Sequence, residues 1–212
     1  MDLSEYWKNR GKTFSQEISN QPSYVQKYLR NQESHILKIL SSTTFENILE
    51  IGCGTGRLTK LISKLPLIKK YLAIDISPDL ISVAQKEIHN PNIVFQCVDI
   101  LEFQTQEKFD LVFSCEVIQH IEPSKIDSVI SKLTSFSKQK LIFVESYDPD
   151  QIGYSKDDYF FIHDYKKIFL RLDLNFNIKK IPLPLSLKFM DKYIKMRNRR
   201  SFGKQAIFEI TL

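Results

Sequence analysis

The segment that decides the fold is Asn47-Ile-Leu-Glu-Ile-Gly-Cys-Gly-Thr-Gly56, in which a short apolar run is followed by glycines at alternate positions. The apolar run predicts a buried strand, and residues 57–65 then show the three- and four-residue apolar spacing of a helix. Glycines between a strand and a helix permit a tight turn and let a ligand approach the backbone. The segment therefore predicts a strand, a glycine turn and a helix that together bind a nucleotide-like cofactor.

Two well-known phosphate-binding patterns fit this turn less well. The segment reads G-x-G-x-G, so it lacks the later glycine of the dinucleotide pattern and the lysine of the phosphate loop. A dinucleotide-dependent oxidoreductase stays open as an alternative, but the glycine spacing does not favour it.

Strands and helices alternate along most of the chain. An amphipathic helix is predicted at 22–40, before the first strand, and a further helix begins at Ser77-Pro78, with Ser as the N-cap and Pro at the first helical position. Such alternation predicts an α/β fold with a seven-stranded, mostly parallel, doubly wound sheet and helices on both faces. The last two strands are expected as an antiparallel addition at the sheet edge. The remaining predicted strands are 71–75, 92–98, 109–114, 141–145, 176–181 and 206–212, and the remaining helices 123–136 and 164–172.

Length and composition predict a single domain. The chain has 212 residues, of which 42% are hydrophobic and 26% charged, and this is enough to bury one substantial core. We expect residues 1–212 to divide into an N-terminal helical cap (1–44), a cofactor-binding core (45–146) and a substrate-side region (147–212) with a loop, a basic segment and the last two strands.

The three cysteines are widely spaced and form no zinc pattern, so we interpret them as free thiols in a reducing compartment. The N-terminus lacks the pattern of a signal peptide, and no apolar stretch approaches the length of a membrane span. The sequence therefore predicts a cytoplasmic protein with no membrane span.

The segment Glu50-Ile-Gly-Cys-Gly-Thr-Gly56 resembles motif I of the class I S-adenosylmethionine-dependent methyltransferases, which have a Rossmann-like fold. The resemblance is strong over residues 45–145. It implies S-adenosyl-L-methionine as the cofactor, with ribose hydroxyls on Asp75 and the adenine amine on Asp99. A carboxylate suits a vicinal diol because it can accept two O–H bonds. The cofactor-binding residues expected from the resemblance are Glu50, Gly52, Gly54, Gly56, Asp75, Ile76, Asp99, Ile100 and Cys115.

His120 is the candidate general base. It follows the fourth predicted strand, where ligands of open α/β sheets bind, and an imidazole can accept a proton near neutral pH. A histidine that only packs and forms hydrogen bonds fits the sequence equally well. The stretch also resembles the E-x-x-E-H segment of two metal-assisted branches of the family, but Gln119 replaces the second acid. No metal ion is therefore predicted.

The acceptor is expected between the N-terminal region, the aromatic loop after the fifth strand and a basic segment near the C-terminus. Residues 188–204 contain seven basic residues and one acid, which fits either a solvated face or a site for an anionic acceptor. The residue pair Tyr6-Trp7 and Arg10 could close over the cofactor's carboxylate, and packing on the surface of a helix fits these residues equally well. The candidate substrate-binding residues are Glu116, Tyr154, His163, Arg197 and Arg199.

The sequence thus predicts methyl transfer to an O or N atom of a small-molecule acceptor, with an anionic acceptor as one option. An RNA 2′-O-methyltransferase and a cofactor-binding module without catalysis are the alternatives. The basic segment favours the RNA interpretation, whereas the missing second acid and the local nature of the positive charge argue against it. The oligomeric state is not predicted.

Overall fold

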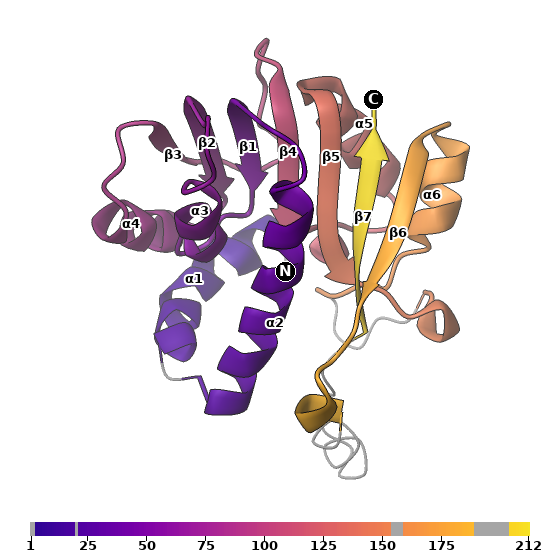
Figure 1. Cartoon of the computed structure of the whole chain (residues 1–212), viewed down its shortest axis with the longest axis horizontal. Helices are drawn as coiled ribbons and strands as arrows, with labels where there is room; N and C mark the ends of the chain where they lie inside the picture. The colour runs from indigo at the N-terminus through magenta and orange to yellow at the C-terminus, as the bar shows by residue number, and fades with distance from the viewer. Residues whose placement is uncertain (1–2, 20, 154–158, 189–203) are drawn as a thin grey trace.

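Seven strands form one sheet in the order β3-β2-β1-β4-β5-β7-β6 (Figure 1). This computed structural model describes residues 3–19, 21–153, 159–188 and 204–212. All neighbouring strands are parallel except β7, which is antiparallel to both β5 and β6. The predicted fold class is therefore confirmed. The strands are β1 (Asn47–Ile51), β2 (Lys70–Asp75), β3 (Ile93–Cys97), β4 (Phe109–Cys115), β5 (Ser137–Ser146), β6 (Asn175–Ile181) and β7 (Gln205–Thr211).

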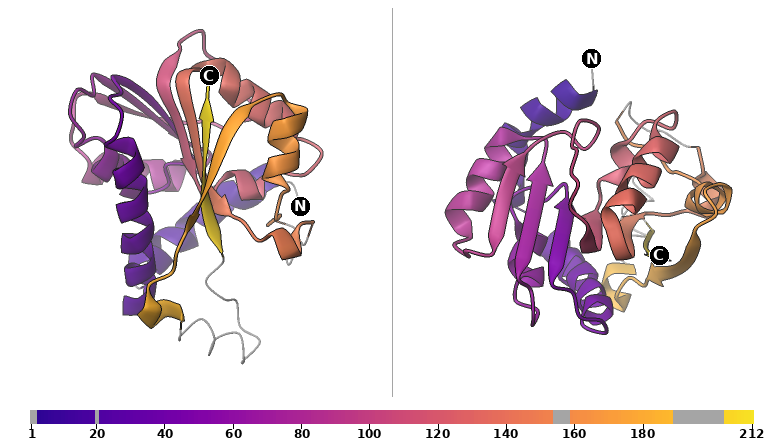
Figure 2. Two further views of the ribbon diagram at one scale, coloured as in Figure 1. Left: turned by 45° about the vertical axis from the view of Figure 1, so that its right-hand side comes forward. Right: turned by 90° about the horizontal axis from the view of Figure 1, so that it is seen from above.

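As predicted, β6 and β7 form an antiparallel addition at the sheet edge, and β7 is the inner of the two strands. This strand, yellow in Figure 2, lies between β5 and β6, and β6 forms the edge. The burial of the two strands explains the order. Residues 205–208 of β7 are all buried, as an inner strand requires, whereas β6 alternates partly buried Phe176 and Ile178 with exposed polar residues.

Helices cover both faces of the sheet. Helix α4 begins as predicted, because the Ser77 hydroxyl accepts a hydrogen bond from the Leu80 amide (3.4 Å) and Pro78 occupies the first turn. None of the described helices is long and apolar enough to cross a membrane. The helices are α1 (Leu3–Ser19), α2 (Ser23–Leu40), α3 (Arg57–Ile62), α4 (Pro78–Glu87), α5 (Ile126–Phe136), α6 (Tyr165–Arg171), and the short 3-10 helices η1 (Ile118–His120) and η2 (Pro149–Gln151).

Each face of the sheet has its own hydrophobic core. Side chains from α5 and α6, such as Ile130 and Phe169, pack with β-strand residues on one face. Side chains from α2 and α3, such as Ile36 and Ile62, pack on the other face. The strands are therefore packed against helices on both faces of the sheet.

Helix α1 and the first half of α2 lie beyond the ends to which the arrowheads of β1 and β2 point (Figure 1). Helix α1 packs against α4 so closely that a Cβ on Gly11 would lie 1.9 Å from the Ser77 hydroxyl oxygen. The order of the strands reverses between β1 and β4, and ligands of open α/β sheets bind at that point. The two N-terminal helices therefore cover the place where a ligand is expected.

Candidate active site

The glycine turn after β1 has an open backbone on its ligand side. Gly52 and Gly54 both have positive φ angles, of +67° and +55°. A Cβ on Gly52 would lie 2.2 Å from Cγ2 of Val117, so neighbouring packing also excludes a side chain there. A Cβ on Gly54 would have no atom within 4 Å, and Gly54 lines a large cavity. The turn thus presents bare backbone to that cavity, with Gly56 as the left-handed N-cap of α3.

Asp75 ends β2 beside the glycine turn and is only 9% exposed. Its Oδ2 accepts a hydrogen bond from the Gly54 amide (2.8 Å), and its Oδ1 accepts one from the Ser77 amide (2.9 Å). Burial raises the pKa of Asp75, and these backbone N–H groups partly oppose that rise. The carboxylate therefore ties the turn to the start of α4 while lining the cavity.

Asp99 holds a comparable position after β3. Its Oδ1 accepts a hydrogen bond from the Leu101 amide (2.9 Å), and its Oδ2 accepts one from the Ser4 hydroxyl of α1 (2.6 Å). Ile76 and Ile100 line the same cavity and add apolar surface. The structure thus brings the two predicted acids, one from each of two neighbouring strands, to one cavity.

Glu50 lies beneath the turn rather than open to solvent. It is 3% exposed, and its Oε2 accepts hydrogen bonds from the Thr59 hydroxyl (2.5 Å) and the Tyr71 hydroxyl (2.9 Å). Burial raises the pKa of Glu50 to about 7. Through these hydrogen bonds Glu50 connects β1 to β2 and α3. Glu50 also lines the cavity.

The cavity has a volume of about 1210 Å³. It extends from the glycine turn, Asp75 and Asp99 to His120 and is closed on one side by α1 and α2. Ligand pockets commonly measure roughly 300–1,000 Å³. The cavity therefore has room for a nucleoside-sized ligand and a second molecule beside it.

Cys115 and Glu116 follow at the end of β4. Burial raises the pKa of the Cys115 thiol well above its ordinary value, which keeps the thiol protonated and unreactive. Glu116 has a φ of +60°, unusual for a residue with a side chain. Its Oε1 accepts hydrogen bonds from the side-chain amides of Gln205 and, at 3.3 Å, Gln32. Both Cys115 and Glu116 line the cavity.

His120 lies on the cavity wall with its ring held in one orientation. Its Nδ1 is 2.6 Å from the Tyr159 carbonyl oxygen, so Nδ1 carries the proton and donates a hydrogen bond to that oxygen. In this tautomer the lone pair is on Nε2, which lies 3.4 Å from the side-chain nitrogen of Gln119. The Trp7 ring packs on the imidazole with centroids 4.3 Å apart. The geometry is that of a histidine able to accept a proton at Nε2.

Glu145 supports the turn that carries His120, and no sequence motif marks it as a functional residue. This carboxylate on β5 is fully buried; its Oε1 accepts hydrogen bonds from the amides of Val117 (3.1 Å) and Ile118 (3.0 Å), and its Oε2 accepts one from Gln119 (3.2 Å). Burial raises the pKa of Glu145 to about 8, against the effect of these N–H groups. Its signal in the sequence was a single acid at the end of the apolar run 141–144.

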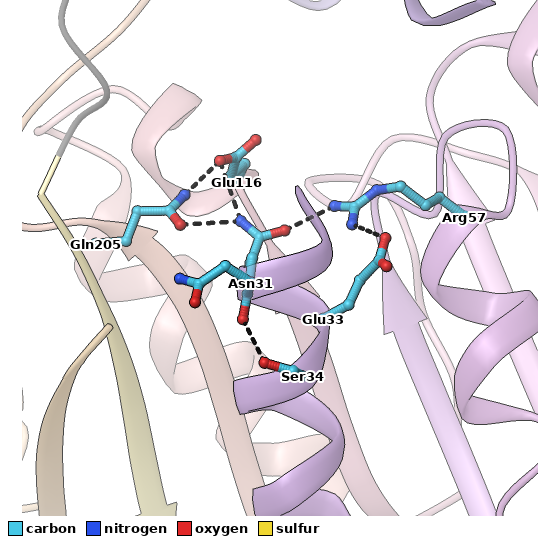
Figure 3. Close-up of polar contacts among 7 residues, drawn as sticks. Asn31, Glu33, Ser34, Arg57, Glu116 and Gln205 are labelled. Atoms are coloured by element: carbon cyan, nitrogen blue, oxygen red, sulfur yellow. Dashed lines mark hydrogen bonds and ion pairs between the residues drawn. The ribbon is translucent and has the colours of Figure 1, made fainter. Parts of the chain in front are cut away.

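Arg57 was also missed, although it directly follows the glycine turn. Its guanidinium donates hydrogen bonds to Glu33 (2.7 Å) and to the Gln32 side chain (2.8 Å), both on α2 (Figure 3). Arg10, expected to close over the cofactor, lines the cavity but pairs with Glu17 at 2.6 Å. Arg57, which follows the turn in the sequence, is thus held by α2, whereas Arg10 pairs within α1.

The substrate-side candidates are brought together only in part. Glu116 lines the cavity, whereas His163 does not, because it is buried behind η1 with 5% of its surface exposed. This burial lowers the pKa of His163. Among the described residues its Nε2 has no hydrogen-bond partner. Lys204, at the end of the basic segment, lines the cavity and pairs with Asp148 at 2.8 Å. Tyr154, Arg197 and Arg199 lie outside the described residues.

No group of three or more His, Cys, Asp or Glu side chains within the described ranges is arranged to hold a metal ion. His120 and Glu116, the two residues shared with the metal-assisted branches, have the hydrogen-bond partners given above.

Part of the chain matches a known protein family. Residues 48–140 match the family model described as a methyltransferase domain. Residues 48–140 are thus a methyltransferase domain, in agreement with the resemblance of the sequence to the class I S-adenosylmethionine-dependent methyltransferases.

Curated relatives include a malonyl-[acyl-carrier protein] O-methyltransferase of Acetivibrio thermocellus, 37% identical over 108 residues, or 50% of this chain and 38% of the relative. Another is malonyl-[acyl-carrier protein] O-methyltransferase 2 of Ilyobacter polytropus, 33% identical over 152 residues, or 71% of this chain and 55% of the relative. The chain therefore spans only about half, or less, of these relatives.

Solved structures show the same fold at low sequence identity. Magnesium protoporphyrin IX methyltransferase from Synechocystis PCC 6803 with bound S-adenosylmethionine superposes with a TM-score of 0.71 at 15% identity, covering 100% of this chain and 97% of the other. The N-methyltransferase NodS from Bradyrhizobium japonicum WM9 superposes with a TM-score of 0.68 at 20% identity, covering 87% and 96%.

Proposed function

We propose that this protein binds S-adenosyl-L-methionine and transfers its methyl group to an O or N atom of a small-molecule acceptor. The observation that carries the proposal is the single cavity that contains the open backbone of Gly54, the carboxylates of Asp75 and Asp99, and the His120 imidazole. Bound in this cavity, the cofactor supplies an electrophilic methyl group on a sulfonium.

The protein's own residues bind and orient the two reactants. Asp75 accepts the ribose hydroxyls with the lone pairs that its backbone contacts leave free, and Asp99 faces the adenine amine. Ile76 and Ile100 pack on the adenine, while Glu50, the glycines and Cys115 form the floor. Holding the acceptor in line with the methyl group contributes up to roughly 7–11 kcal/mol to catalysis of such displacements.

The acceptor that we propose to test first is a carboxylate on a carrier-bound acyl group. The relatives named as malonyl-[acyl-carrier protein] O-methyltransferases support this choice. Two lysines line the cavity, Lys125 paired with Glu122 and Lys204 paired with Asp148. A carboxylate is already ionised at neutral pH, so it needs no general base, whereas a hydroxyl or ammonium acceptor needs His120 at Nε2.

The proposal also covers the extent of the domain, the location of the protein and the residues that contact the acceptor. We propose one methyltransferase domain over residues 1–212, since the sheet draws strands from residue 47 to residue 211. A cytoplasmic location is in keeping with three unpaired cysteines. Acceptor contacts by Tyr154, Arg197 and Arg199 are part of the same proposal, as is a contact by Glu116; the placement of His163 supports no such contact.

Ligand-dependent melting tests cofactor choice. S-adenosylhomocysteine at 100 times its Kd should raise the Tm by about 5–10 °C, since this saturation adds about 2.7 kcal/mol to a domain of this size. NAD should not raise it. Stabilisation by NAD and not by S-adenosylhomocysteine would refute the proposal in favour of an oxidoreductase.

Methyl transfer from labelled S-adenosylmethionine tests the acceptor. Malonyl-acyl-carrier protein should be labelled, and His120→Gln should change kcat by less than about threefold because a carboxylate needs no base. A loss of 100-fold or more in His120→Gln would instead identify a hydroxyl or amine acceptor. Labelling of RNA alone, with binding that weakens steeply as salt rises, would support the RNA alternative.

A further inference from the structure

Gln119, in the 3-10 helix η1, is held at both its backbone and its side chain. The residue is 5% exposed. Its backbone N–H donates to Oε2 of Glu145 at 3.2 Å, and its backbone carbonyl accepts a hydrogen bond from the Phe161 amide at 2.8 Å. Its side-chain Oε1 accepts one from the Ser146 amide at 3.2 Å. Contacts from β5 and from the loop before α6 therefore fix the position of this glutamine.

The contact with Ser146 also fixes which way the side-chain amide of Gln119 faces. A backbone N–H is only a donor, so the atom that it meets is the amide oxygen, and the other atom is the NH₂ group. That nitrogen lies 3.4 Å from Nε2 of His120, and this contact uses one of its two N–H donors. The second N–H has no acceptor among the described residues, and Gln119 lines the cavity. Gln119 thus offers the cavity one oriented, uncharged donor.

Aromatic rings surround this part of the cavity. The Trp7 ring packs on the His120 imidazole with centroids 4.3 Å apart, and the Phe160 ring lies 6.0 Å from the same imidazole. Trp7, Phe160 and Tyr147 all line the cavity together with Gln119. A hydrogen bond is stronger in such a low-dielectric setting than in water. A single N–H of Gln119 can therefore contribute substantially to the binding of an acceptor oxygen.

The basic side chains on the cavity wall are already neutralised. Within the described part of the chain, every Lys and Arg that lines the cavity pairs with a carboxylate. The pairs are Arg10 with Glu17 (2.6 Å), Arg57 with Glu33 (2.7 Å), Lys125 with Glu122 (2.5 Å) and Lys204 with Asp148 (2.8 Å). Recognition of an acceptor oxygen beside His120 therefore depends on uncharged donors such as the Gln119 amide.

An uncharged donor suits a carboxylate that is to be methylated. One carboxylate oxygen forms a bond to the methyl carbon, the bond from that carbon to sulfur breaks with its electron pair staying on sulfur, and no proton moves. The carboxylate loses its negative charge as the sulfonium loses its positive charge. A cation beside the carboxylate would therefore stabilise the reactant more than the transition state. An amide N–H on the other oxygen keeps its hydrogen bond, because that oxygen becomes the carbonyl of the ester.

We propose that Gln119 binds a carboxylate of the acceptor: its second N–H holds the oxygen that is not methylated, and the other oxygen faces the methyl group. The inference rests on the proposed function and states how that site selects an acidic acyl group over an amine. An ammonium has no lone pair with which to accept this hydrogen bond. The metal-assisted branches have an acid at this position, which would repel a carboxylate, whereas glutamine does not.

Two acceptor probes test the selectivity: malonyl-acyl-carrier protein, which ends in a carboxylate, and glycyl-acyl-carrier protein, which has an ammonium in nearly the same place. With labelled S-adenosylmethionine, only the malonyl probe should be methylated. Gln119→Met is similar in size but has no N–H, so it should lower kcat/KM for the malonyl probe about 10- to 100-fold, as expected for a lost hydrogen bond to a charged group. Its affinity for S-adenosylhomocysteine, measured by calorimetry, should change less than about twofold.

Charged variants test the argument from charge. Gln119→Glu keeps an oxygen for the Ser146 amide and should lower kcat/KM further, because two carboxylates repel each other. Gln119→Lys should lower both KM and kcat, because an ammonium stabilises the bound carboxylate more than the transition state.

Gln151→Met is the matched control. Gln151 also lines the cavity but is exposed on η2, so kcat/KM should change less than about threefold. The Tm of each variant establishes that it is folded, and Gln119→Glu serves as the test variant if Gln119→Met does not fold.

Unchanged kcat/KM in folded Gln119→Met, or a raised kcat in Gln119→Lys, would overturn the inference. An equal loss of S-adenosylhomocysteine affinity would also overturn it, since Gln119 would then act through the cofactor. Methylation of the glycyl probe, or of neither probe, would overturn it as well, while the proposed cofactor would stand as long as S-adenosylhomocysteine raises the Tm. If S-adenosylhomocysteine did not raise the Tm of the unmodified protein, the proposed function itself would fail, and the inference with it.

Discussion

Replacement of Asp75 by asparagine separates its two roles, in the fold and in cofactor binding. The carboxylate accepts one backbone hydrogen bond on each oxygen, from Gly54 (2.8 Å) and from Ser77 (2.9 Å). Asparagine has the same shape but only one acceptor oxygen, so its NH₂ group must face one of the two backbone N–H donors. The variant therefore leaves one buried donor without a partner.

The structure sets the size of both effects. An unsatisfied buried donor costs about 1–3 kcal/mol, which corresponds to a Tm lowered by about 2–12 °C in a domain of this size. The burial that raises the pKa of Asp75 offsets part of this loss, because asparagine carries no buried charge. For the ribose, the loss of one charged hydrogen bond weakens S-adenosylhomocysteine binding about 10- to 100-fold.

Calorimetry with S-adenosylhomocysteine and its 2′-deoxy analogue measures the ribose contact directly. The unmodified protein should bind the deoxy analogue about 10- to 100-fold more weakly, whereas Asp75→Asn should discriminate much less between the two ligands. Asp79→Asn, an acid in the first turn of α4, is the matched control and should bind both normally. If folded Asp75→Asn bound S-adenosylhomocysteine within twofold of the unmodified protein, Asp75 would not hold the ribose.

Three further predictions follow from the turn and the buried acids. Gly52→Ala should lower the free energy of unfolding by about 2–4 kcal/mol in urea titrations, because its Cβ would meet Val117 and its φ is positive. Gly54→Ala, with open space around its Cβ, should cost about 1–2 kcal/mol of stability but abolish detectable S-adenosylhomocysteine binding; a reversed order of stabilities would contradict both assignments. Burial raises the pKa of Glu50 to about 7 and of Glu145 to about 8 from an ordinary value of 4.5, so the folded state binds more protons than the unfolded state and stability should fall as pH rises from about 4.5 to 8. In Glu50→Gln, the loss of unfolding free energy over this pH range should be smaller by roughly 3 kcal/mol. A loss equal to that of the unmodified protein would show that the pKa of Glu50 is not raised.

The predicted elements agree with the structure where local rules determine them. The N-cap at Ser77 with Pro78 is one example, and the strand, glycine turn and helix around Gly54 is another. Boundaries were less accurate, since β5 begins at Ser137 rather than at residue 141. The first helix, α1, had no predicted limits because its sequence is polar, and contacts such as that of Ser4 with Asp99 attach it to the core.

Among the candidate site residues, those at strand ends could be placed from the sequence because parallel strands bring their carboxyl ends to one edge. His120 lines the cavity for this reason, whereas His163, in an irregular loop, is buried behind η1. Glu145 and Gln32 had no local signal of function, because an isolated acid in a strand and a glutamine in a helix are common.

The sequence by itself determined the order of strands and helices, the positive-φ glycine turn and the acids at the strand ends, since each depends on residues close together in the chain. The tertiary structure alone decided that β7 enters between β5 and β6 and that Gln32 meets Gln205, 173 positions away. It also decided that Glu145 supports the turn carrying His120. The physical reason is that these contacts arise from how the helices and strands pack, and a side chain's distant partners leave no periodic pattern in the sequence.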